Sequence, residues 1–520
     1  MSTKASRPDS SPIVPGSAAA ATPVVAPSTS LATLTAPGGT VAGLAAPIPP
    51  PSGAAAPGTP AWLGTVNDRA ALSIIVERGI ATRNLVHQVT GLSKPTASQV
   101  MARLLNAGLV VDVGPVPSRR GPSAAGYAAN DARHVGVAIE VTRTSVNATL
   151  VDVTGTEYPV HRFLRGDARE HELVLPEGEA GPDGEPLDHG AATAVAEIRA
   201  AIDGAAAAAG RDAALVRHLL ISIPGSVNPE IDVLWGAEAL APWPVSGLRT
   251  LLEHTIGATV TLERDVKLAT IAELAEADEP EDICLLWLGN GLGLVNVANG
   301  AIVPGRHGRS GEIGYLPAPS GPEGHGAHDM QDLLGGLAVR RILREAGIGL
   351  DAENLDGALT ELGALIRAAE AGDRDEDTGA AGEAHPGDAV DATGQPGPAG
   401  DAAGPGAEPA SADPSAPVLP DVDEETVGGV LDVIADRIAL MAMPTLFLLD
   451  PVRLVLAGPT AVAGGELLAR LVNERVRPST GWTLDVSSTR VRGRAPLLGA
   501  RLLLLASVRS ALLDEVSADL

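Results

Sequence analysis

Three amphipathic segments with helical spacing of their apolar positions follow one another between residues 61 and 130. Asn67, Thr82 and Ser93 stand at their starts, where each side chain can accept a hydrogen bond from the first free N–H groups of a helix. A β-rich stretch, a turn at 117–122 and a return strand come next. Helices followed by a hairpin in this order predict a winged helix-turn-helix domain.

The third segment combines a buried stripe with a polar face. Its apolar residues recur at i, i+3, i+4 and i+7, which predicts the side that packs inward. The small, polar opposite side suits the major groove of duplex DNA, and two arginines at the hairpin tip could reach phosphates or a minor groove. A small interaction domain with an ordinary solvated face is the alternative. The residues expected to contact DNA are Lys94, Thr96, Gln99, Arg103, Arg119 and Arg120.

After Asn130 the pattern changes to mixed α/β. A meander of short strands leads to an Ala-rich helix near 191–208 and a buried strand, and a similar set of elements begins at Ala258. The repeated order predicts two α/β lobes around a cleft. The expected domains are a Pro/Ala-rich arm (1–60), the winged helix-turn-helix domain (61–130), lobe 1 (131–250) and lobe 2 (251–520), with an acidic insertion at about 371–417.

Composition sets two tracts apart from the rest. Residues 1–60 hold twelve prolines and no aromatic residue, and 371–417 contain no Leu, Ile or aromatic residue, so both are expected to be disordered. Cys284 is the only cysteine, which excludes an intrachain disulfide. No uninterrupted apolar run reaches the ~18 residues of a membrane span, and no signal peptide is evident, so a cytoplasmic protein is expected.

Charge is unevenly distributed along the chain. The net charge is −27, yet seven basic residues against three acidic ones give 61–130 a charge of +4. A small cationic segment on an acidic body is compatible with DNA binding, which the pI of about 4.7 would otherwise argue against.

Short motifs in a specific order resemble those of the ROK family, which unites bacterial sugar kinases and sugar-responsive transcription factors. The resemblance covers about 61–370 and 418–520. It implies an α/β fold in which a winged helix-turn-helix precedes a two-lobed, actin-like ATPase domain, and the N-terminal domain is typical of the family's regulators. The motifs are Leu92 to Thr96, Arg119 to Pro122, Ile223-Pro224-Gly225, Trp243, Asp265, the glycine loop 289–293, Gly311 to Gly314, Leu456-Ala457-Gly458 and Gly464.

Departures from the family pattern indicate that kinase activity has been lost. Kinases of the family open with Asp-x-Gly-Gly-Thr, but the aligned stretch here is Ala138 to Thr142, with Glu140 at the first glycine position. A carboxylate there would repel a phosphate, and larger residues would keep the backbone from approaching it. The glycine loop persists with Asn290 where Thr is usual, and by itself it is as typical of a strand connection. The Cys-rich zinc run is absent, leaving only His325 and His328, so neither a metal nor a cofactor is expected.

The sugar site is retained in part. Asp265 matches the family's catalytic Asp, which would act as a general base, and Glu312 matches a carboxylate that accepts hydrogen bonds from sugar hydroxyl groups. Arg264 replaces the usual Asn, and Tyr315 replaces a His. These four residues are expected to contact an effector, although a helix cap for Asp265 and an ion pair for Glu312 are the structural alternatives.

These features predict a DNA-binding transcriptional regulator, a repressor, whose sugar or sugar-derived effector binds a catalytically inactive kinase-like domain. Its expected partners are an inverted-repeat duplex and a second copy of the chain, which would pair through a long C-terminal helix at about Leu497 to Val516. Two rival hypotheses are an active sugar kinase with a fused DNA-binding head, and a regulator controlled by a protein partner without sugar binding.

Overall fold

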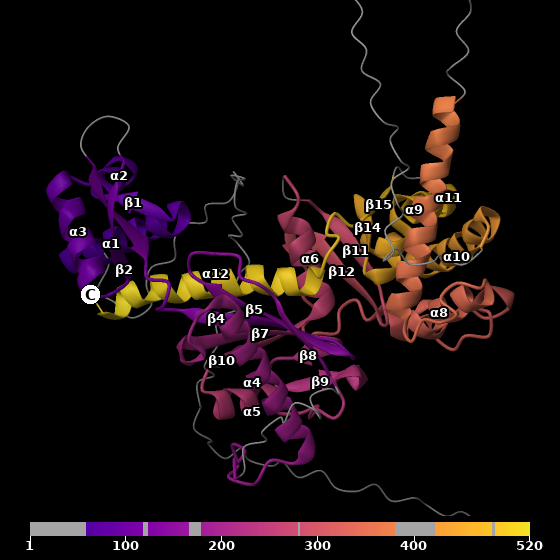
Figure 1. Ribbon diagram of the computed structural model, residues 1–520, viewed down its shortest axis with the longest axis horizontal. Helices are drawn as coiled ribbons and strands as arrows, with labels where there is room; N and C mark the ends of the chain where they lie inside the picture. Colours follow the sequence, from indigo (N-terminus) through magenta and orange to yellow (C-terminus); the bar gives the residue numbers. More distant parts are fainter. Residues whose placement is uncertain are drawn as a thin grey trace, which may run out of the picture.

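The computed structural model describes residues 59–117, 123–165, 178–278, 281–379, 422–480 and 484–519. Most of the predicted N-terminal arm and most of the acidic insertion lie outside these ranges, as do Arg119 and Arg120 at the predicted hairpin tip. Figure 1 shows a small N-terminal unit, two larger lobes, and one long C-terminal helix that runs from between the lobes to the N-terminal unit.

The N-terminal unit contains the elements that the sequence predicts, with one more strand. Thr82 and Ser93 cap their helices as expected, since Thr82 Oγ1 accepts from Leu85 N and Ser93 Oγ from Thr96 N. The first helix, however, begins at Pro60 with Thr59 as its cap, so Asn67 lies inside it. The additional strand makes the sheet three-stranded in the order β1-β3-β2. The elements are α1 (Pro60–Arg78), β1 (Ile80–Thr82), α2 (Arg83–Thr90), α3 (Lys94–Asn106), β2 (Val110–Val116) and β3 (Ala124–Ala129).

Each lobe is built on a five-stranded sheet of the same topology. Three strands form an antiparallel meander, and two further strands are added in parallel beside its first strand. The sheet of lobe 1 has the order β10-β7-β4-β5-β6, with β4 (Val135–Val141), β5 (Ser145–Asp152), β6 (His161–Leu164), β7 (Val216–Ile223) and β10 (Thr259–Arg264). The sheet of lobe 2 has the order β13-β12-β11-β14-β15, with β11 (Ile283–Leu288), β12 (Leu292–Ala298), β13 (Ala301–Ile302), β14 (Arg453–Ala457) and β15 (Asp485–Ser488).

The predicted boundary between the lobes at residue 250 is too early. Strand β10 pairs in parallel with β7, from Thr259 opposite His218 to Arg264 opposite Ile223, and so completes the sheet of lobe 1. The sequence shows the order of the elements but not which strands pair with each other. The predicted boundary therefore assigns β10 to lobe 2, whereas its partner strand β7 lies in lobe 1.

Helices cover both sheets. Helix α9 extends past 371 into the tract predicted as an insertion. A two-stranded ribbon of β8 (Ser226–Asn228) and β9 (Val233–Trp235) lies beside the cleft end of lobe 1. The helices are α4 (His189–Ala209), α5 (Leu248–Ile256), α6 (Asp265–Ala275), α7 (Met330–Leu334), α8 (Gly336–Glu345), α9 (Leu355–Gly379), α10 (Glu424–Leu449), α11 (Pro459–Thr480) and α12 (Ala495–Asp519).

One face of helix α12 is covered within the chain. Its inward residues share one hydrophobic core with the N-terminal unit and with the sheet of lobe 1. It packs so closely on α6 that a Cβ added to Gly499 would lie 1.8 Å from the carbonyl oxygen of Leu268. The excess of leucines that predicted a dimer interface is explained by contacts on several sides of the helix. The inward residues are Leu497, Ala500, Leu504, Val508, Leu512 and Val516.

By length and composition alone, α12 could cross a membrane over Ala495–Val516, and no other helix of the described residues passes that test. The sequence analysis found no such run because Arg501 and Arg509 interrupt it. Both arginines bond to lobe 1, Arg501 to Glu157 and Arg509 to the carbonyl of Val153, so the helix belongs to the protein core.

Candidate functional site

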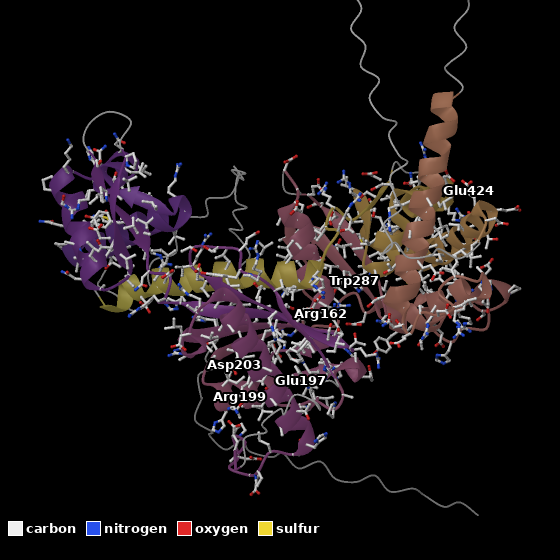
Figure 2. All side chains as sticks on the ribbon, in the orientation of Figure 1. Arg162, Glu197, Arg199, Asp203, Trp287 and Glu424 are labelled. Carbon is white, nitrogen blue, oxygen red and sulfur yellow. The ribbon has the colours of Figure 1, made fainter. Side chains whose placement is uncertain are left out.

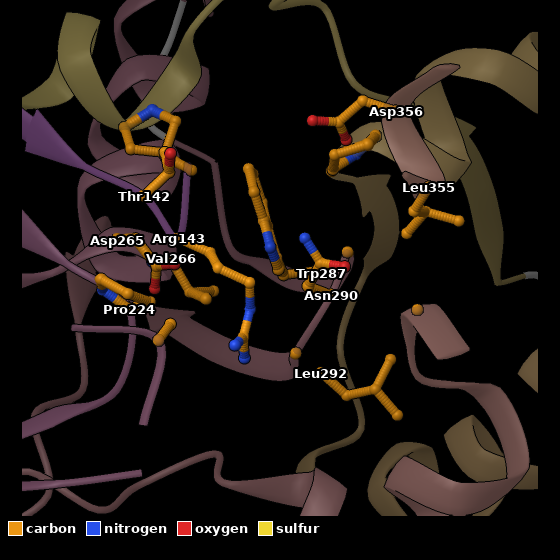
Figure 3. Close-up of a pocket in the computed structure, with 18 of the residues that line it drawn as sticks. Thr142, Arg143, Pro224, Asp265, Val266, Trp287, Asn290, Leu292, Leu355 and Asp356 are labelled. Carbon is orange, nitrogen blue, oxygen red and sulfur yellow. The ribbon is translucent and has the colours of Figure 1, made fainter. Parts of the chain in front are cut away.

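A cavity of about 1280 Å³ lies between the two lobes. Figure 3 shows Thr142, Asp265 and Val266 on one side of it, Leu355 and Asp356 on the other, and Trp287 and Asn290 between them. The same Trp287 is seen in Figure 2 where the lobes meet. The cavity therefore joins the positions of both the sugar motifs and the phosphate motifs recognised in the sequence.

The four predicted effector residues all line this cavity. Arg264 ends β10 and Asp265 begins α6, whereas Glu312 and Tyr315 come from the loop after β13. The fold thus brings together residues of both lobes that are about fifty positions apart in the sequence.

The carboxyl of Asp265 lines this cavity and has a pKa near neutral pH. Burial raises the pKa of its carboxyl to about 7, with the nearby carboxylates of Glu140 and Glu312 adding to the effect. Its Oδ1 accepts a hydrogen bond from the N–H of the next residue, Val266, at 2.8 Å. The cap position of α6 is Arg264, and no side chain caps the helix there, so the helix cap considered as the structural alternative is not formed. Such a carboxyl can exchange a proton with a ligand hydroxyl near neutral pH.

Arg264 is buried, with 7% of its surface exposed, and it bonds to lobe 2. Nη1 donates to the carbonyl of Ser310 at 2.6 Å, and Nη2 donates to that of Gly311 at 3.3 Å. Nη2 also lies 3.2 Å from Glu312 Oε1. The ion pair considered as the structural alternative for Glu312 is therefore present, and its partner is the neighbouring effector candidate.

Ser226, which the sequence analysis did not select, completes this cluster. Its hydroxyl donates to the same Glu312 Oε1 that faces Arg264. It directly follows the Ile223-Pro224-Gly225 motif, so its position next to a glycine turn was the available signal.

Tyr315 is largely exposed at the mouth of the cavity, with 62% of its surface accessible. Burial and the charge of Glu238 raise the pKa of its phenol. The hydroxyl approaches Gly236 so closely that a Cβ there would lie 2.9 Å from it.

An acidic side chain lines the predicted phosphate half of the cleft. Glu140, at the first glycine position of the kinase motif, is only 7% exposed, and burial raises the pKa of its carboxyl. Asn147 Nδ2 donates to its Oε2 at 2.9 Å, and Arg494 Nη1 lies 3.7 Å from the same oxygen. These residues do not fit a nucleotide phosphate, because a carboxylate stands where the anion would be and a second anion would be repelled.

Arg494 was not found from the sequence. It lies in the loop before α12, and only the fold brings it against β4. No motif marks it, so a sequence pattern could not have selected it.

Packing accounts for two glycines of the 289–293 loop without a nucleotide. A Cβ on Gly289 would lie 2.8 Å from Trp287 Nε1. A Cβ on Gly293 would lie 2.7 Å from Val266 and 3.0 Å from Arg264 Nη2. The loop is therefore compatible with the strand connection that the sequence analysis left open.

Trp243, one of the resemblance motifs, is a core residue. It is 5% exposed, and its Nε1 donates to Glu197 Oε2 at 2.8 Å. Arg165 pairs with the same carboxylate at 3.0 Å and donates to the carbonyls of Ala239 and Leu240. Glu197 lies on α4 (Figure 2), and the cluster holds the chain between β9 and α5 in place.

The predicted DNA-contacting residues of α3 are in different environments. Lys94 and Gln99 are exposed, and the Thr96 hydroxyl lies 2.8 Å from that of Ser93. Arg103, which is predicted to contact DNA, is also bonded within the N-terminal unit. Its Nε and Nη2 donate to the two oxygens of Asp68 at 2.8 and 2.5 Å, and the Asp68 side chain is 1% exposed. This pair fastens α3 to α1.

Among the described residues, no group of three His, Cys, Asp or Glu side chains could hold a metal ion. His325 lines a second cavity of about 330 Å³, and His328 lies outside that lining.

Comparison with known proteins connects this cleft to a family. Residues 185–358 match the sequence profile described as the ROK family. The chain carries a ROK family domain. The match includes five of the motifs quoted from the sequence, from Ile223-Pro224-Gly225 to Gly311 to Gly314, with Asp265 and Glu312 among their residues, whereas the motifs before residue 185 and after residue 358 lie outside it.

Relatives of the ROK domain include enzymes. The β-glucoside kinases of Listeria innocua and Listeria monocytogenes are 33% and 32% identical to this chain over 103 residues. That segment is 19% of this chain and 35% of each kinase, so the chain spans about a third of the length of these relatives.

A solved structure shares the fold over most of the chain. It is a ROK family transcriptional regulator described as a homolog of the E. coli MLC protein, with a TM-score of 0.53 and 16% identity. The alignment covers 87% of this chain and 99% of the other. At this level of identity the likeness shows the fold alone, an α/β fold of the actin-like ROK type.

Proposed function

We propose that the protein is a DNA-binding transcriptional regulator, a repressor, controlled by a sugar or sugar-derived effector in the cleft of its ROK domain. The observation that carries the proposal is the pairing of two features in one chain. One is an N-terminal unit of three helices and a hairpin, and the other is a kinase-like cleft whose predicted phosphate half is lined by Glu140.

The N-terminal unit has the form of a winged helix-turn-helix domain. Helix α3 is the recognition helix, and its exposed Lys94 and Gln99 contact the major groove. Thr96 lies on the same helix, and Arg119 and Arg120 contact phosphates or the minor groove from the hairpin. Arg103 holds α3 on α1 through Asp68 and so sets the angle at which the helix is presented.

Helix α12 connects the cleft to this unit. Its first residues, Ala495 and Pro496, line the cavity, and near its end Asp514 pairs with Arg69 of α1 at 2.9 Å. The next residue, Glu515, pairs with Arg133 and His134 at the start of lobe 1. Effector binding that moves the lobes changes the position of α12 and, with it, the spacing of the two DNA-reading units in a dimer.

The test is selection of genomic DNA fragments by the purified protein at near-physiological salt, followed by sequencing. The expected result is enrichment of one inverted repeat. Only weak, steeply salt-dependent recovery of all sequences would contradict the proposal, because non-specific binding of a cationic segment gives that result.

A sugar kinase with a fused DNA-binding unit is the second candidate, favoured by the β-glucoside kinase relatives and by the near-neutral carboxyl of Asp265. It requires ATP-dependent phosphorylation of a sugar that Asp265→Asn abolishes. Wild-type turnover lost in that variant would establish the kinase, whereas no turnover across a panel of hexoses and β-glucosides supports the regulator.

A further inference from the structure

The Arg264–Glu312 pair joins the two lobes at the sugar position of the cleft. Arg264 belongs to the sheet of lobe 1, and the three polar contacts of its guanidinium are all to residues 310–312 of lobe 2. Ser226 of β8 adds a fourth cross-lobe bond to the same glutamate. The polar groups at the sugar position are therefore bonded to other groups of the protein itself.

One carboxylate oxygen of Glu312 is already bonded within the protein in this arrangement. Its Oε1 faces both Arg264 Nη2 and the Ser226 hydroxyl, and its side chain is 19% exposed. A sugar hydroxyl that donates to Oε1 has to compete with a guanidinium, and charge-assisted bonds are stronger than neutral ones.

If a ligand separates Arg264 from Glu312, the guanidinium loses its anionic partner, and only a ligand with a negative charge can replace that partner. Arg264 is more buried than Glu312, so a neutral ligand that takes Glu312 leaves a guanidinium without its anion in a poorly hydrated place. Removing one partner of a buried ion pair is strongly unfavourable for that reason. A ligand with its own anionic group takes over as the partner of Arg264 and leaves its hydroxyls free for Glu312 and Asp265.

We propose that the cleft binds a sugar acid, whose carboxylate replaces Glu312 as the partner of Arg264. This inference rests on the proposed effector function and names its ligand class. Arg264 is the specificity-determining residue, since it disfavours neutral hexoses and selects the acid.

A carboxylate fits this position better than a phosphate. It has the single charge and the planar shape of the glutamate that it displaces, and a guanidinium binds it through two parallel hydrogen bonds. A phosphate dianion would bring a second negative charge close to Glu140, Asp265 and Glu312, which line the same cavity.

Calorimetric titration of the full chain tests the proposal. The ligands are glucuronate, galacturonate and gluconate, with glucose, galactose and glucose 6-phosphate for comparison. At least one sugar acid is expected to bind at least about tenfold more tightly than the matched neutral sugar and than glucose 6-phosphate. Equal or tighter binding of a neutral hexose or of the phosphate, or no binding of any acid, overturns the proposal.

Variants of Arg264 test whether this residue causes the preference for a sugar acid. Arg264→Asn is expected to lose at least about tenfold in affinity for the acid and to gain affinity for the neutral sugar. Arg264→Lys keeps the charge and should retain part of the preference, which provides a second test if Arg264→Asn does not fold. Arg143→Asn, which removes an exposed arginine lining the same cavity, is the matched control and should leave the preference unchanged. A preference that is undiminished in either folded Arg264 variant overturns the proposal.

Failure of this inference is distinguishable from failure of the proposed function. If the protein enriches an inverted repeat but binds no sugar acid, the regulator stands and the ligand class is wrong. If it binds a sugar acid through Arg264 without selecting any DNA, the ligand class stands and the regulator is wrong.

Discussion

In both proposed sites of this chain, charged side chains form ion pairs with other residues of the protein. In the N-terminal unit, Arg103 is bonded to a carboxylate that is almost wholly buried. In the cleft, Glu140 and Glu312 are each approached by an arginine of the same chain. A charged residue on a polar face is therefore not by itself a ligand contact, and its partner has to be known first.

The Arg103–Asp68 pair makes a prediction about stability. Arg103→Ala leaves the buried Asp68 carboxylate without its partner and should cost about 2 kcal/mol of unfolding free energy, less than a fully buried pair because Arg103 is partly exposed. Gln99→Ala, at an exposed position of the same helix, should change stability by less than about 0.5 kcal/mol. Chemical denaturation measures both. Unchanged stability of Arg103→Ala together with lost DNA affinity would instead support the base-reading role.

The raised pKa of Asp265 makes a prediction about pH. Because the folded protein holds this proton up to about pH 7 while the unfolded chain releases it near pH 4, the group should reduce stability progressively from about pH 4 to pH 7 and no further above it. Asp265→Asn should remove this component, so the variant gains on wild type between about pH 4 and pH 7. Denaturant titrations at several pH values measure the difference. A difference between wild type and variant that does not change with pH would contradict the raised pKa.

At the scale of elements, sequence patterns predicted local structure well and partners poorly. Thr82 and Ser93 were identifiable as caps because capping depends on residues three positions apart. The buried strand before Ile223 was identifiable because a run of apolar residues stood before a Pro-Gly turn. Pairing of β10 with β7 and the Arg494–Glu140 contact were not, because both depend on segments brought together only by the fold.

The close contact of α6 and α12 gives a prediction at this scale. Ala in place of Gly inside a helix usually adds up to about 1 kcal/mol of stability. Gly499→Ala should instead cost at least about 2 kcal/mol, because its Cβ would meet the backbone of Leu268. Gly428→Ala is the matched control, since it lies inside α10 with no atom within 4 Å of the added Cβ, and it should be stabilising. If both variants melted at the same temperature, the helix packing described here would be wrong.

At the scale of the whole molecule, one continuous hydrophobic core joins the N-terminal unit to the ROK domain through α12. Helix α12 contacts both the sheet of lobe 1 and the N-terminal unit (Figure 1). We therefore expect a movement of the lobes to move the N-terminal unit as well. The sequence predicted this helix but not its contacts with α6, with the sheet of lobe 1 and with α1, since composition does not reveal which neighbour covers an apolar face.

The proposed regulator requires that α3 reads a DNA sequence. The most direct test is fluorescence-anisotropy titration, at fixed near-physiological salt, of the inverted repeat enriched from the genome and of a scrambled duplex of equal length. Wild type should prefer the repeat by at least about a thousandfold, and a Lys94→Ala, Gln99→Ala double variant should lose most of that preference while keeping its weak affinity for the scrambled duplex. Equal affinity of the wild-type protein for the two duplexes would contradict the account.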